Sequence, residues 1–449
     1  MIREILTNLN SFEIYTLFKD EKHSFILDSA MDEENLGRYS FISSNPFKVL
    51  KYKDSEINPL EKLRVELKKY KIKNDTGLPF IGGAVGYLSY DLGNYIEKLP
   101  RTVVDDMKAP DLYFGLYDWV IVIDHLMNKT FIATPDINVR DENYIVNYLS
   151  KLISNAQDNG VDKLCYEQKT FPRVKLESNF KKKDYIDAIE KMRNYIRSGD
   201  IYQANMTQRF HGKVSMSSFE LYRDLRRISP APFGAFLNFE DIHILSNSPE
   251  RFIKVNNKFI QTRPIKGTRP RGKSKEEDLL LRNELLNSEK DKAELLMIVD
   301  LERNDIGRIS KIGTVRVPEL FKLEEYSNVH HLVSTVVGEI KEDKDIVDVI
   351  SSTFPGGSIT GAPKIRAMEI IDELEPTARN VYTGSIGYIG FDSNADFNIS
   401  IRTIIKKDED IFFQVGGGIT WDSNPEEEYE ETLHKAKSIM NAIRGYYEE

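Results

Sequence analysis

The sequence is poor in cysteine and in long apolar stretches, and each shortage excludes a class of protein. Its 449 residues include one cysteine, Cys165, so the chain can form neither a disulfide framework nor a cysteine-ligated zinc site. No stretch approaches the roughly 18 consecutive apolar residues of a membrane-spanning helix. The first residues also lack the apolar core and small-residue cleavage site of a signal peptide. We therefore expect a cytoplasmic protein that does not cross a membrane.

Positive charge is not in excess either. The formal net charge is −9, with 40% hydrophobic and 30% charged residues, which is an ordinary composition for a soluble globular protein. An acidic chain is poorly suited to bind nucleic acid or an anionic membrane, because both carry the same sign of charge. If the ligand is an anion, the positive charges that bind it must be concentrated locally.

The hydrophobic patterning divides the chain into two regions. Residues 1–150 contain short runs rich in β-branched and aromatic residues, which are typical of strands and turns. Residues 154–182 are polar and weakly patterned, which favours a linker. Residues 180–449 combine strands with amphipathic helices. The fold class is therefore mixed α and β.

Several local patterns in the second region can be assigned. Residues 276–305 predict one long helix without caps, and Pro425 opens a last helix that reaches about residue 445. Two strands flank Asn256–Asn257, which we interpret as a two-residue hairpin turn. Gly416–Gly418 interrupt a strand pattern. Either the strand has a bulge there, or the backbone approaches another group closely and receives a carboxylate on its N–H groups.

The basic stretch QTRPIKGTRPRG, residues 261–272, has two interpretations. It gathers Arg263, Lys266, Arg269 and Arg271 among prolines and glycines. It could be an arm that binds nucleic acid, although the net charge and the acidic KEEDLL segment that follows make this improbable. It could instead be a stiff loop that presents the amine of Lys266 to a small anion.

Two pairs of acidic residues have helical spacing. Glu428 and Glu431 lie three residues apart, and Lys435 extends their face. Acids at a helix start are often a solvated first turn that favours the helix dipole. The alternative is a Mg²⁺ site, because hard cations take carboxylates, water and substrate oxygens. Asp291 and Glu294 form a second pair before a strongly apolar run, and two facing pairs would make a four-carboxylate cage.

Two other candidates have simpler explanations. His330 and His331 precede an apolar run, where a histidine is more often a hydrogen-bonded core residue than a catalyst. Cys165 lacks the tight turn in which the nucleophilic cysteine of a glutaminase sits. We therefore do not expect this chain to release ammonia from glutamine by itself.

A set of long motifs resembles one family of enzymes. The motifs occur in this order: IYQANMTQRF, SPERF, RPIKGTRPRG, DKAELLMIVDLERNDIGRI, PGGSITGAPKIRAMEIIDELEP, TGSIGYIGF and GGGITWDSNPEEEYEETLHKA. Together they resemble the chorismate-utilising enzymes over residues 180–445, and the segment FILDSA…GRYSFIS resembles the N-terminal part of the amine-transferring branches. The resemblance implies one compact unit, a large intertwined two-sheet sandwich flanked by helices, that contains both 1–150 and 180–449.

The resemblance also implies a set of functional residues. It implies Mg²⁺ held mainly by Glu294 and Glu431, with Asp291 and Glu428 reaching it through water. The residues that it places near the substrate carboxylates are Tyr388, Arg402, Gly416, Gly418 and Lys435. The residues that would line the ring or side chain of the substrate are Gly267, Thr268, His331 and Ser358.

The basic stretch bears on which branch of the family the chain resembles. PIKGT resembles the aminodeoxychorismate synthase branch, where the lysine is a covalent nucleophile, whereas anthranilate synthases usually carry alanine at this position. The water-using isochorismate branch carries a lysine base where this chain has Gln203. If Asn256–Asn257 is the turn, Glu250 pairs roughly opposite Arg263 and lies close enough to Lys266 to be the general acid.

Two partners follow from the same resemblance. A separate glutaminase subunit would supply ammonia to the chorismate site. Residues that resemble a tryptophan pocket are Asp28, Ser29, Arg38, Tyr39 and Ser40. Phe233–Gly234 replaces the Tyr-Met of feedback-inhibited enzymes, so the pocket could hold a structural tryptophan without regulation. The alternative in the same fold is an anthranilate synthase of tryptophan synthesis.

Overall fold

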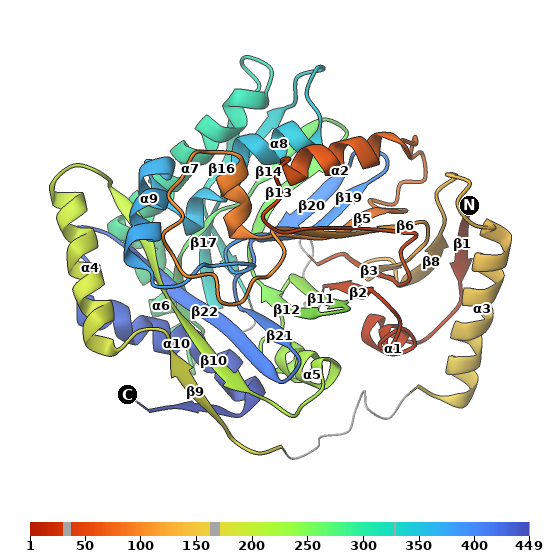
Figure 1. Cartoon of the computed structure of the whole chain (residues 1–449), viewed down its shortest axis with the longest axis horizontal. Coiled ribbons are helices and arrows are strands. Elements are labelled where there is room, and N and C mark those ends of the chain that lie inside the picture. Colours follow the sequence, from red (N-terminus) through yellow and green to blue (C-terminus); the bar gives the residue numbers. More distant parts are fainter. Residues whose placement is uncertain (30–36, 162–170, 327–328, 449) are drawn as a thin grey trace.

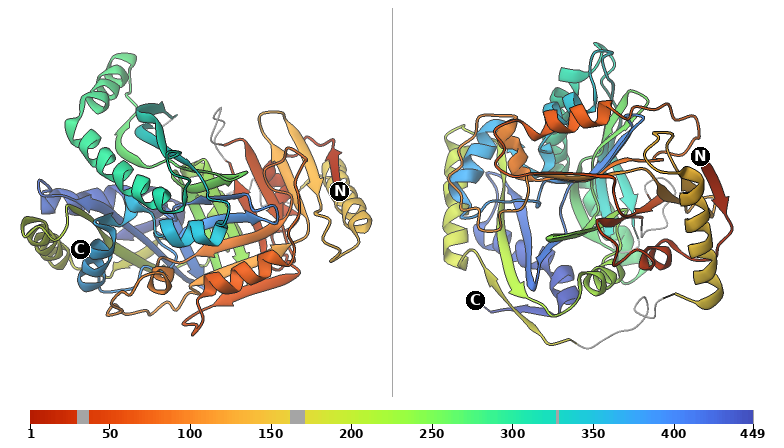
Figure 2. Two further views of the ribbon diagram at one scale, coloured as in Figure 1. Left: turned by 90° about the horizontal axis from the view of Figure 1, so that it is seen from above. Right: turned by 45° about the vertical axis from the view of Figure 1, so that its right-hand side comes forward.

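The chain folds into two large sheets with helices on their outer faces, as the computed structural model shows (Figure 1). The structure describes residues 1–29, 37–161, 171–326 and 329–448, so Cys165 lies outside the described residues. The N-terminus lies beside β1 and the C-terminus beside β9, at opposite sides of the molecule in Figures 1 and 2. The predicted mixed α and β class, with two sheets flanked by helices, is confirmed.

The first sheet joins strands from both ends of the chain. Its order is β1-β8-β7-β3-β2-β11-β12-β21-β22-β10-β9-β23, with β18 paired to β10. N-terminal strand β2 is antiparallel to β11, with Asp28 opposite Gly234. The bounds are β1 Ile2–Ile5, β2 Ser24–Asp28, β3 Tyr39–Ser43, β7 Val120–Asp124, β8 Lys129–Ala133, β9 Val174–Ser178, β10 Gln203–Lys213, β11 Phe233–Phe239, β12 Ile242–Ser248, β18 Gly361–Ala362, β21 Thr403–Lys407, β22 Asp410–Ile419 and β23 Gly445–Tyr447.

The second sheet joins the two regions in the same way. Its order is β15-β17-β14-β13-β20-β19-β5-β6-β4, with β16 paired to β17. The N-terminal strand β5 pairs with β19, with Gly86 opposite Gly387. The bounds are β4 Lys48–Tyr52, β5 Gly83–Leu88, β6 Leu112–Tyr117, β13 Arg251–Asn256, β14 Phe259–Thr262, β15 Ile265–Pro270, β16 Arg316–Glu325, β17 Val329–Glu339, β19 Ser385–Gly390 and β20 Ala395–Asn398.

Helices cover the outer faces of the sheets, with α3 beside β1 and α4 at the opposite side (Figure 1). The last helix begins at the predicted Pro425, with Asn424 capping the backbone N–H groups of Glu426 and Glu427. The bounds are α1 Ser11–Thr16, α2 Pro59–Lys68, η1 Tyr90–Tyr95, α3 Glu142–Asn159, α4 Lys182–Arg197, α5 Ser218–Ile228, α6 Lys275–Asn287, α7 Glu289–Ile309, α8 Ile346–Thr353, η3 Gly357–Ile359, α9 Lys364–Leu374 and α10 Pro425–Ile443.

The two sheets pack face to face through a shared apolar core. One cluster of buried side chains contains Phe25 and Ile244 from the first sheet together with Tyr113 and Ile386 from the second. Each of these side chains is at most 2% exposed. In a β-sandwich, the interdigitating side chains on the inner faces of the two sheets form the hydrophobic core. Residues 1–133 therefore contribute to the same core as the later strands.

Two segment predictions were wrong. The supposed linker at 154–182 is largely structured in its described part, because α3 continues to Asn159 and β9 pairs with β10 and β23. The supposed single helix at 276–305 is two helices, α6 and α7. Ser288 separates them, and its hydroxyl accepts a hydrogen bond from Asp291 N at the start of α7.

The predicted hairpin turn is displaced by one residue. Asn256 pairs with Phe259, so the turn residues are Asn257 and Lys258, and both have positive φ, 48° and 72°. Two residues with positive φ give the twist that a tight hairpin requires. The displacement shifts the register of β14 by two residues, which changes the partner of Glu250.

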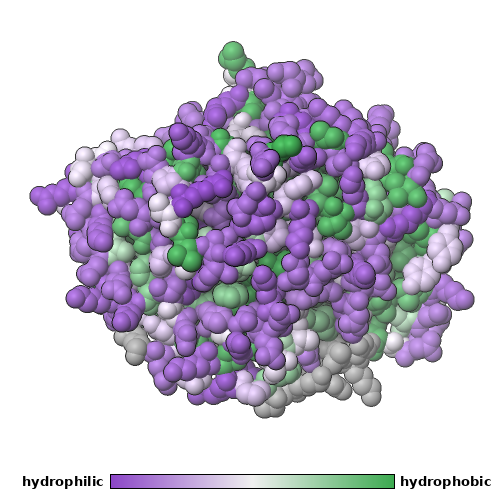
Figure 3. All heavy atoms as spheres, viewed as in Figure 1, coloured by the Kyte–Doolittle hydropathy of each residue, from purple (hydrophilic) through white to green (hydrophobic). Residues whose placement is uncertain are grey.

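The surface carries no large apolar area on the face shown in Figure 3, where hydrophobic residues are scattered among hydrophilic ones. Among the described residues, no helix is both long and apolar enough to cross a membrane.

Candidate active site

Lys266 and Glu250 lie near each other beside the β13–β14 hairpin, close enough for each charge to act on the other's pKa. In the observed register Glu250 faces Ile265, whose backbone N–H donates to Glu250 Oε1 at 3.4 Å, so the acid lies next to Lys266 and not opposite Arg263 as predicted. The Lys266 ammonium donates to the Ser358 carbonyl at 3.2 Å. Burial lowers the pKa of Lys266 and raises the pKa of Glu250. Both shifts favour the neutral forms, an amine and a carboxylic acid.

Gly267 allows the backbone to bulge after the lysine. The pairing of β15 with β17 skips one residue between Lys266 and Thr268, and Gly267 has a φ of 76°. A Cβ at this position would lie 2.9 Å from Cγ of Asp291 and 2.8 Å from Leu285. Only glycine fits this conformation and this space, so β15 can lie directly against α7.

Thr268, His331 and Arg402 form the next part of the site. Thr268 Oγ1 and His331 Nδ1 are 2.9 Å apart. Burial lowers the pKa of His331 to about 3, and the positive charge of Arg402 acts in the same direction. His331 is therefore neutral at physiological pH, able to donate or accept a hydrogen bond but not to act as a cation.

The Arg402 guanidinium is an uncompensated positive charge. Burial lowers its pKa, and in the described part of the chain it makes no hydrogen bond or ion pair. Arg402 also has a left-handed backbone with a φ of 50°, and its carbonyl accepts a hydrogen bond from Asn247 N. A partly buried cation without an acid is costly unless an anion binds to it. This arrangement fits a ligand carboxylate.

We expect Arg402→Ala to weaken substrate binding without destabilising the protein. Removing the contact to a carboxylate should raise KM for the anionic substrate by about 10- to 100-fold, the effect of a lost charged hydrogen bond. Because no acid of the described residues pairs with Arg402, the melting temperature should be unchanged or higher. Steady-state kinetics and calorimetry measure both.

Arg251 provides the matched control. It is 6% exposed and forms a two-pronged ion pair with Asp396, at 2.9 and 3.1 Å. Arg251→Ala leaves that acid unpaired and should lower the melting temperature. A melting temperature that falls as far in the Arg402 variant as in the Arg251 variant would contradict an uncompensated charge.

The acids of the two pairs lie near enough to act on one another's pKa. Burial raises the pKa of Glu294 and of Glu428, and the nearby Glu431 raises both further. For Glu431 burial opposes ionisation, but Lys435 outweighs it and lowers the pKa. Lys435 lies 2.6 Å from Glu431 Oε1 and donates to the Gly416 carbonyl at 2.9 Å. Helices α7 and α10 therefore present three acids to one space beside Lys266.

A preformed four-carboxylate cage is not found. No group of three or more acids, histidines or cysteines among the described residues is arranged to hold a metal ion. Asp291 instead binds Arg269 at 3.2 Å, and Glu428 accepts from Ser423 at 2.7 Å. The cluster still fits Mg²⁺, which often takes one or two carboxylates and completes its coordination with water and substrate oxygens. Burial is the main cause of the raised pKa values of Glu294 and Glu428, and the negative charge of Glu431, which a bound cation would offset, adds to it.

The glycines of β22 have no bulge, so that alternative is wrong. Gly416, Gly417 and Gly418 stay in register with β10, opposite Thr207, Met206 and Asn205. A Cβ at Gly418 would collide with the side-chain amide of Gln203, and one at Gly417 would lie 3.0 Å from Glu428. The glycines thus bring the β22 backbone against the acid cluster and Lys435.

Tyr388 lies elsewhere, and its predicted role at the substrate carboxylates is not supported by its position. It is 5% exposed in the core between the sheets, with its ring 4.5 Å from that of Phe80 and 5.3 Å from that of Phe41. Burial raises its pKa most, and the groups whose charge also acts on it, Asp396, Asp392, Arg251 and Tyr39, all lie outside the acid cluster. Of the other predicted substrate residues, Ser358 accepts from Lys266 through its carbonyl, Thr268 contacts His331, and Lys435 contacts Gly416.

The five residues predicted for a tryptophan pocket lie together at the ends of β2 and β3. The Asp28 carboxylate is 2% exposed, pairs with Arg226 and accepts from Ser40 at 3.3 Å. Ser29 Oγ donates to the Tyr39 carbonyl at 2.9 Å, and Arg38 pairs with Asp124 at 2.7 Å. The charged groups of this set are thus engaged within the protein, and a tryptophan ligand stays a prediction.

Sequence reasoning missed two residues near the acids. Lys290 acts on the pKa of Glu294, Glu428 and Glu431. Its spacing from Glu294, four residues along one helix, was the signal that could have shown it. Glu302 lies further along α7 and is 7% exposed. Burial holds the pKa of its carboxyl well above the usual range, and the negative charge of Glu250 acts in the same direction.

Comparisons with known proteins identify the family of the chain. Residues 22–441 match the family described as chorismate binding enzyme. The chain is 39% identical to anthranilate synthase component 1 of Aquifex aeolicus, over 98% of this chain and 96% of that protein. It is also 39% identical to aminodeoxychorismate synthase component 1 of Bacillus subtilis, over 98% and 95%. The crystal structure of anthranilate synthase component I from Streptococcus pneumoniae superimposes with a TM-score of 0.81 at 32% identity, covering 91% of this chain and 93% of that one.

Proposed function

Because the chain belongs to the chorismate-binding enzyme family, we propose that it is the synthase component that converts chorismate and ammonia to 4-amino-4-deoxychorismate, in the synthesis of 4-aminobenzoate and folate. The observation that carries this proposal is the position of Lys266. Its amine lies beside the acid Glu250 and faces the space bordered by Glu294 and Glu431. An amine with a lowered pKa is equipped to be a nucleophile.

The proposed reaction uses Lys266 and Glu250 as a pair. Lys266 adds through Nζ to C2 of chorismate, and the C4 hydroxyl leaves as water after Glu250 donates a proton. Ammonia then forms a bond to C4 and expels the lysine amine, so the enolpyruvyl group is retained. Burial supports both roles, because it lowers the pKa of the amine and raises that of the acid.

The remaining residues would hold the substrate. Arg402 and Lys435, with the Gly416–Gly418 backbone, would bind the substrate carboxylates, and the neutral His331 with Thr268 and Gly267 would border the ring. Mg²⁺, held by Glu294 and Glu431 directly and by Asp291 and Glu428 through water, would neutralise one substrate carboxylate. Ser358 supports Lys266 through its carbonyl.

Ammonia would come from another protein. The names of the similar proteins contain "component 1", which supports a second component. We infer that this is a glutaminase subunit. Free ammonium should replace it in vitro.

The alternative is an anthranilate synthase component. The similarity to anthranilate synthase component 1 of Aquifex aeolicus is as high as that to the aminodeoxychorismate enzyme of Bacillus subtilis. That reaction also consumes chorismate but forms an aromatic product and pyruvate.

Product analysis separates the two activities. The enzyme is incubated with chorismate, Mg²⁺ and ammonium, with and without a lyase that converts aminodeoxychorismate to 4-aminobenzoate. We expect 4-aminobenzoate only when the lyase is present, and no fluorescent anthranilate. Direct formation of anthranilate and pyruvate would assign the chain to the other branch.

We expect a bell-shaped dependence of kcat/KM on pH. Activity requires Glu250 protonated and Lys266 neutral. It should therefore fall at high pH, above the raised pKa of Glu250, and at low pH, below the lowered pKa of Lys266. In Glu250→Gln the residual activity should lose the decline at high pH. Retention of that decline in the variant would assign it to another group.

A further inference from the structure

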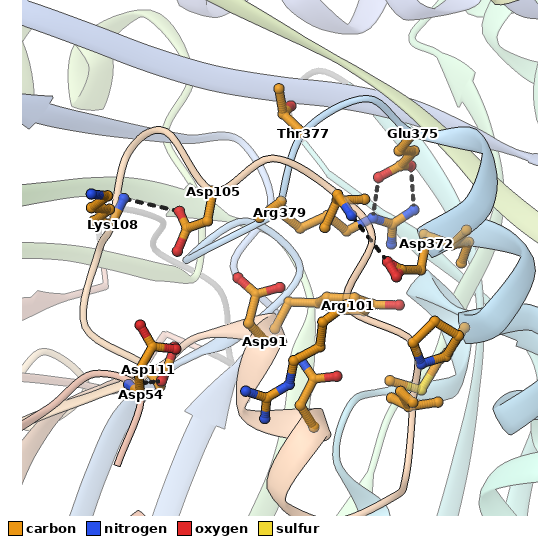
Figure 4. Close-up of a pocket in the computed structure, with 18 of the residues that line it drawn as sticks. Asp54, Asp91, Arg101, Asp105, Lys108, Asp111, Asp372, Glu375, Thr377 and Arg379 are labelled. Atoms are coloured by element: carbon orange, nitrogen blue, oxygen red, sulfur yellow. Dashed lines mark hydrogen bonds and ion pairs between the residues drawn. The ribbon is translucent and has the colours of Figure 1, made fainter.

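A second cavity lies away from Lys266. It has a volume of about 380 Å³ and lies between the segment from η1 to β6 and the segment from α9 to Arg379 (Figure 4). Figure 4 shows Asp54, Asp91, Asp105 and Asp111 from the N-terminal segments opposite Asp372, Glu375 and Arg379. A volume of this size is within the range of small-molecule sites. None of the residues assigned above to chorismate or Mg²⁺ lines it.

One ion pair separates this cavity from the active site. The fully buried Arg379 binds Glu375, at 2.7 and 2.9 Å, and donates to the carbonyls of Asn205 and Ile359. Ile359 follows Ser358, whose carbonyl accepts from Lys266. The two sites therefore have a wall in common but are distinct.

Several charged groups of the cavity are paired with one another. Lys53 binds Asp105 and Asp111, the latter at 3.1 Å. Arg379 binds Glu375, and Asp372 accepts from the backbone N–H of Thr102 at 2.9 Å. Six acids and four bases line the cavity, so negative charge is in excess.

Two adjacent groups of η1 are left without such partners. The Asp91 carboxylate accepts one backbone hydrogen bond, from Asn380 N at 3.0 Å, and forms no ion pair with another described residue. The Tyr90 hydroxyl, on a side chain 8% exposed, has no hydrogen-bond partner among the residues that the structure describes. Burial raises the pKa of Asp91 to about 7. The Asp91 carboxylate, which lines the cavity, therefore has free capacity to accept from a hydrogen-bond donor.

We propose that this cavity binds a small organic amine. Its ammonium group lies against the Asp91 carboxylate, and its hydrocarbon part packs on Leu99, Met368 and Ile371. An ammonium group supplies donors and the positive charge that the excess of acids lacks. The apolar lining residues give the hydrocarbon part a surface to cover. The proposal does not depend on which branch of the family the catalysis follows.

Calorimetric titration with three probes tests the ligand class. We expect benzylamine to bind wild-type protein saturably with one site per chain at about pH 8, where an acid of pKa about 7 is ionised. Benzyl alcohol has the same shape without the charge and should not bind. L-phenylalanine separates a simple amine from an amino acid, because its carboxylate faces the acidic lining and should weaken binding. No saturable benzylamine binding, or equal binding of the alcohol, would overturn the proposal.

Three variants locate the probe. Asp91→Asn keeps the hydrogen bond from Asn380 but loses the charge, and should weaken benzylamine binding by about tenfold or more. Tyr90→Phe keeps the ring, over which Arg379 lies at 4.8 Å, and removes only a hydroxyl that is buried away from the cavity, so it should leave the affinity nearly unchanged. Asp54→Asn is the control, because it removes the same charge from a different lining residue and should leave the affinity nearly unchanged. Equal losses in the Asp91 and Asp54 variants would indicate a diffuse charge effect and overturn the site.

The pH dependence gives an independent check. Benzylamine stays protonated while Asp91 titrates, so its affinity should rise between about pH 6 and about pH 8 as the carboxylate ionises. The rise should be absent in Asp91→Asn. A rise that persists in that variant would assign the pH dependence to another group.

Discussion

Lys266→Ala should abolish the covalent intermediate and lower the turnover of chorismate by about 10³-fold or more, the scale of losing a catalytic nucleophile. Lys266 is the amine that touches Ser358 and lies beside Glu250. Mass spectrometry of enzyme quenched during turnover should find chorismate-derived mass on wild-type protein and none on the variant. Chorismate binding, measured by calorimetry, should change much less than turnover.

Lys273 is the matched control for this experiment. It is an exposed lysine in the same basic segment, and its backbone N–H, not its side chain, holds Glu277. Lys273→Ala should leave turnover and the trapped adduct unchanged. An unchanged turnover rate in the Lys266 variant would refute the nucleophile, whatever the product is.

Removal of divalent metal should abolish activity, and Mg²⁺ should restore it. The reason is that the partly buried acids of α7 and α10 lie near one another, so that Glu431 adds to the effect of burial on the pKa of Glu294 and of Glu428. Glu294→Gln and Glu431→Gln should each lower activity by about 10²-fold or more, because a carboxylate ligand is lost. Activity that survives chelation would contradict the metal assignment.

A binding measurement makes the same test without turnover. Mg²⁺ should raise the melting temperature of the wild type, since a ligand that binds only the folded state stabilises it. It should raise that of the two variants less. Glu430→Gln is the control, because Glu430 is exposed on the same helix and pairs with Lys182. A melting shift that is equal in all proteins would place the ion elsewhere.

Local signals in the sequence were sufficient for much of the fold. Pro425 and Asn424 define the start of α10, and the alternating apolar runs define β2, β3 and β7. The turn of the β13–β14 hairpin was not predictable from the sequence. A tight hairpin turn needs positive φ at both residues, and asparagine adopts it more readily than lysine, so the pattern favoured Asn256–Asn257 over the observed Asn257–Lys258. That single displacement moved every pair of the hairpin by two residues, and it brought Glu250 closer to Lys266.

The sequence predicts which residues are neighbours where they share a face of one helix. It does not predict on which face of a sheet a strand residue lies. Glu428 with Glu431, and Asp291 with Glu294, share a helix face whatever the rest of the chain does. The side of β19 on which Tyr388 lies depends on its pairing with Val85 and Asp396, which no local pattern reveals. The sequence also did not predict the second cavity, which Asp91 lines, because Arg379 and Glu375 line it from a segment far away in the sequence.

The pairing of β2 with β11 and of β5 with β19 has a consequence during protein synthesis. The ribosome releases β2 and β5 long before their partners exist, so the early strands emerge with unpaired edges and no core to cover them. Contacts between residues far apart in sequence also slow folding. We therefore expect the nascent chain to depend on chaperones until β19 has emerged, and a chain cut between residues 150 and 180 to yield two insoluble pieces when each is made alone.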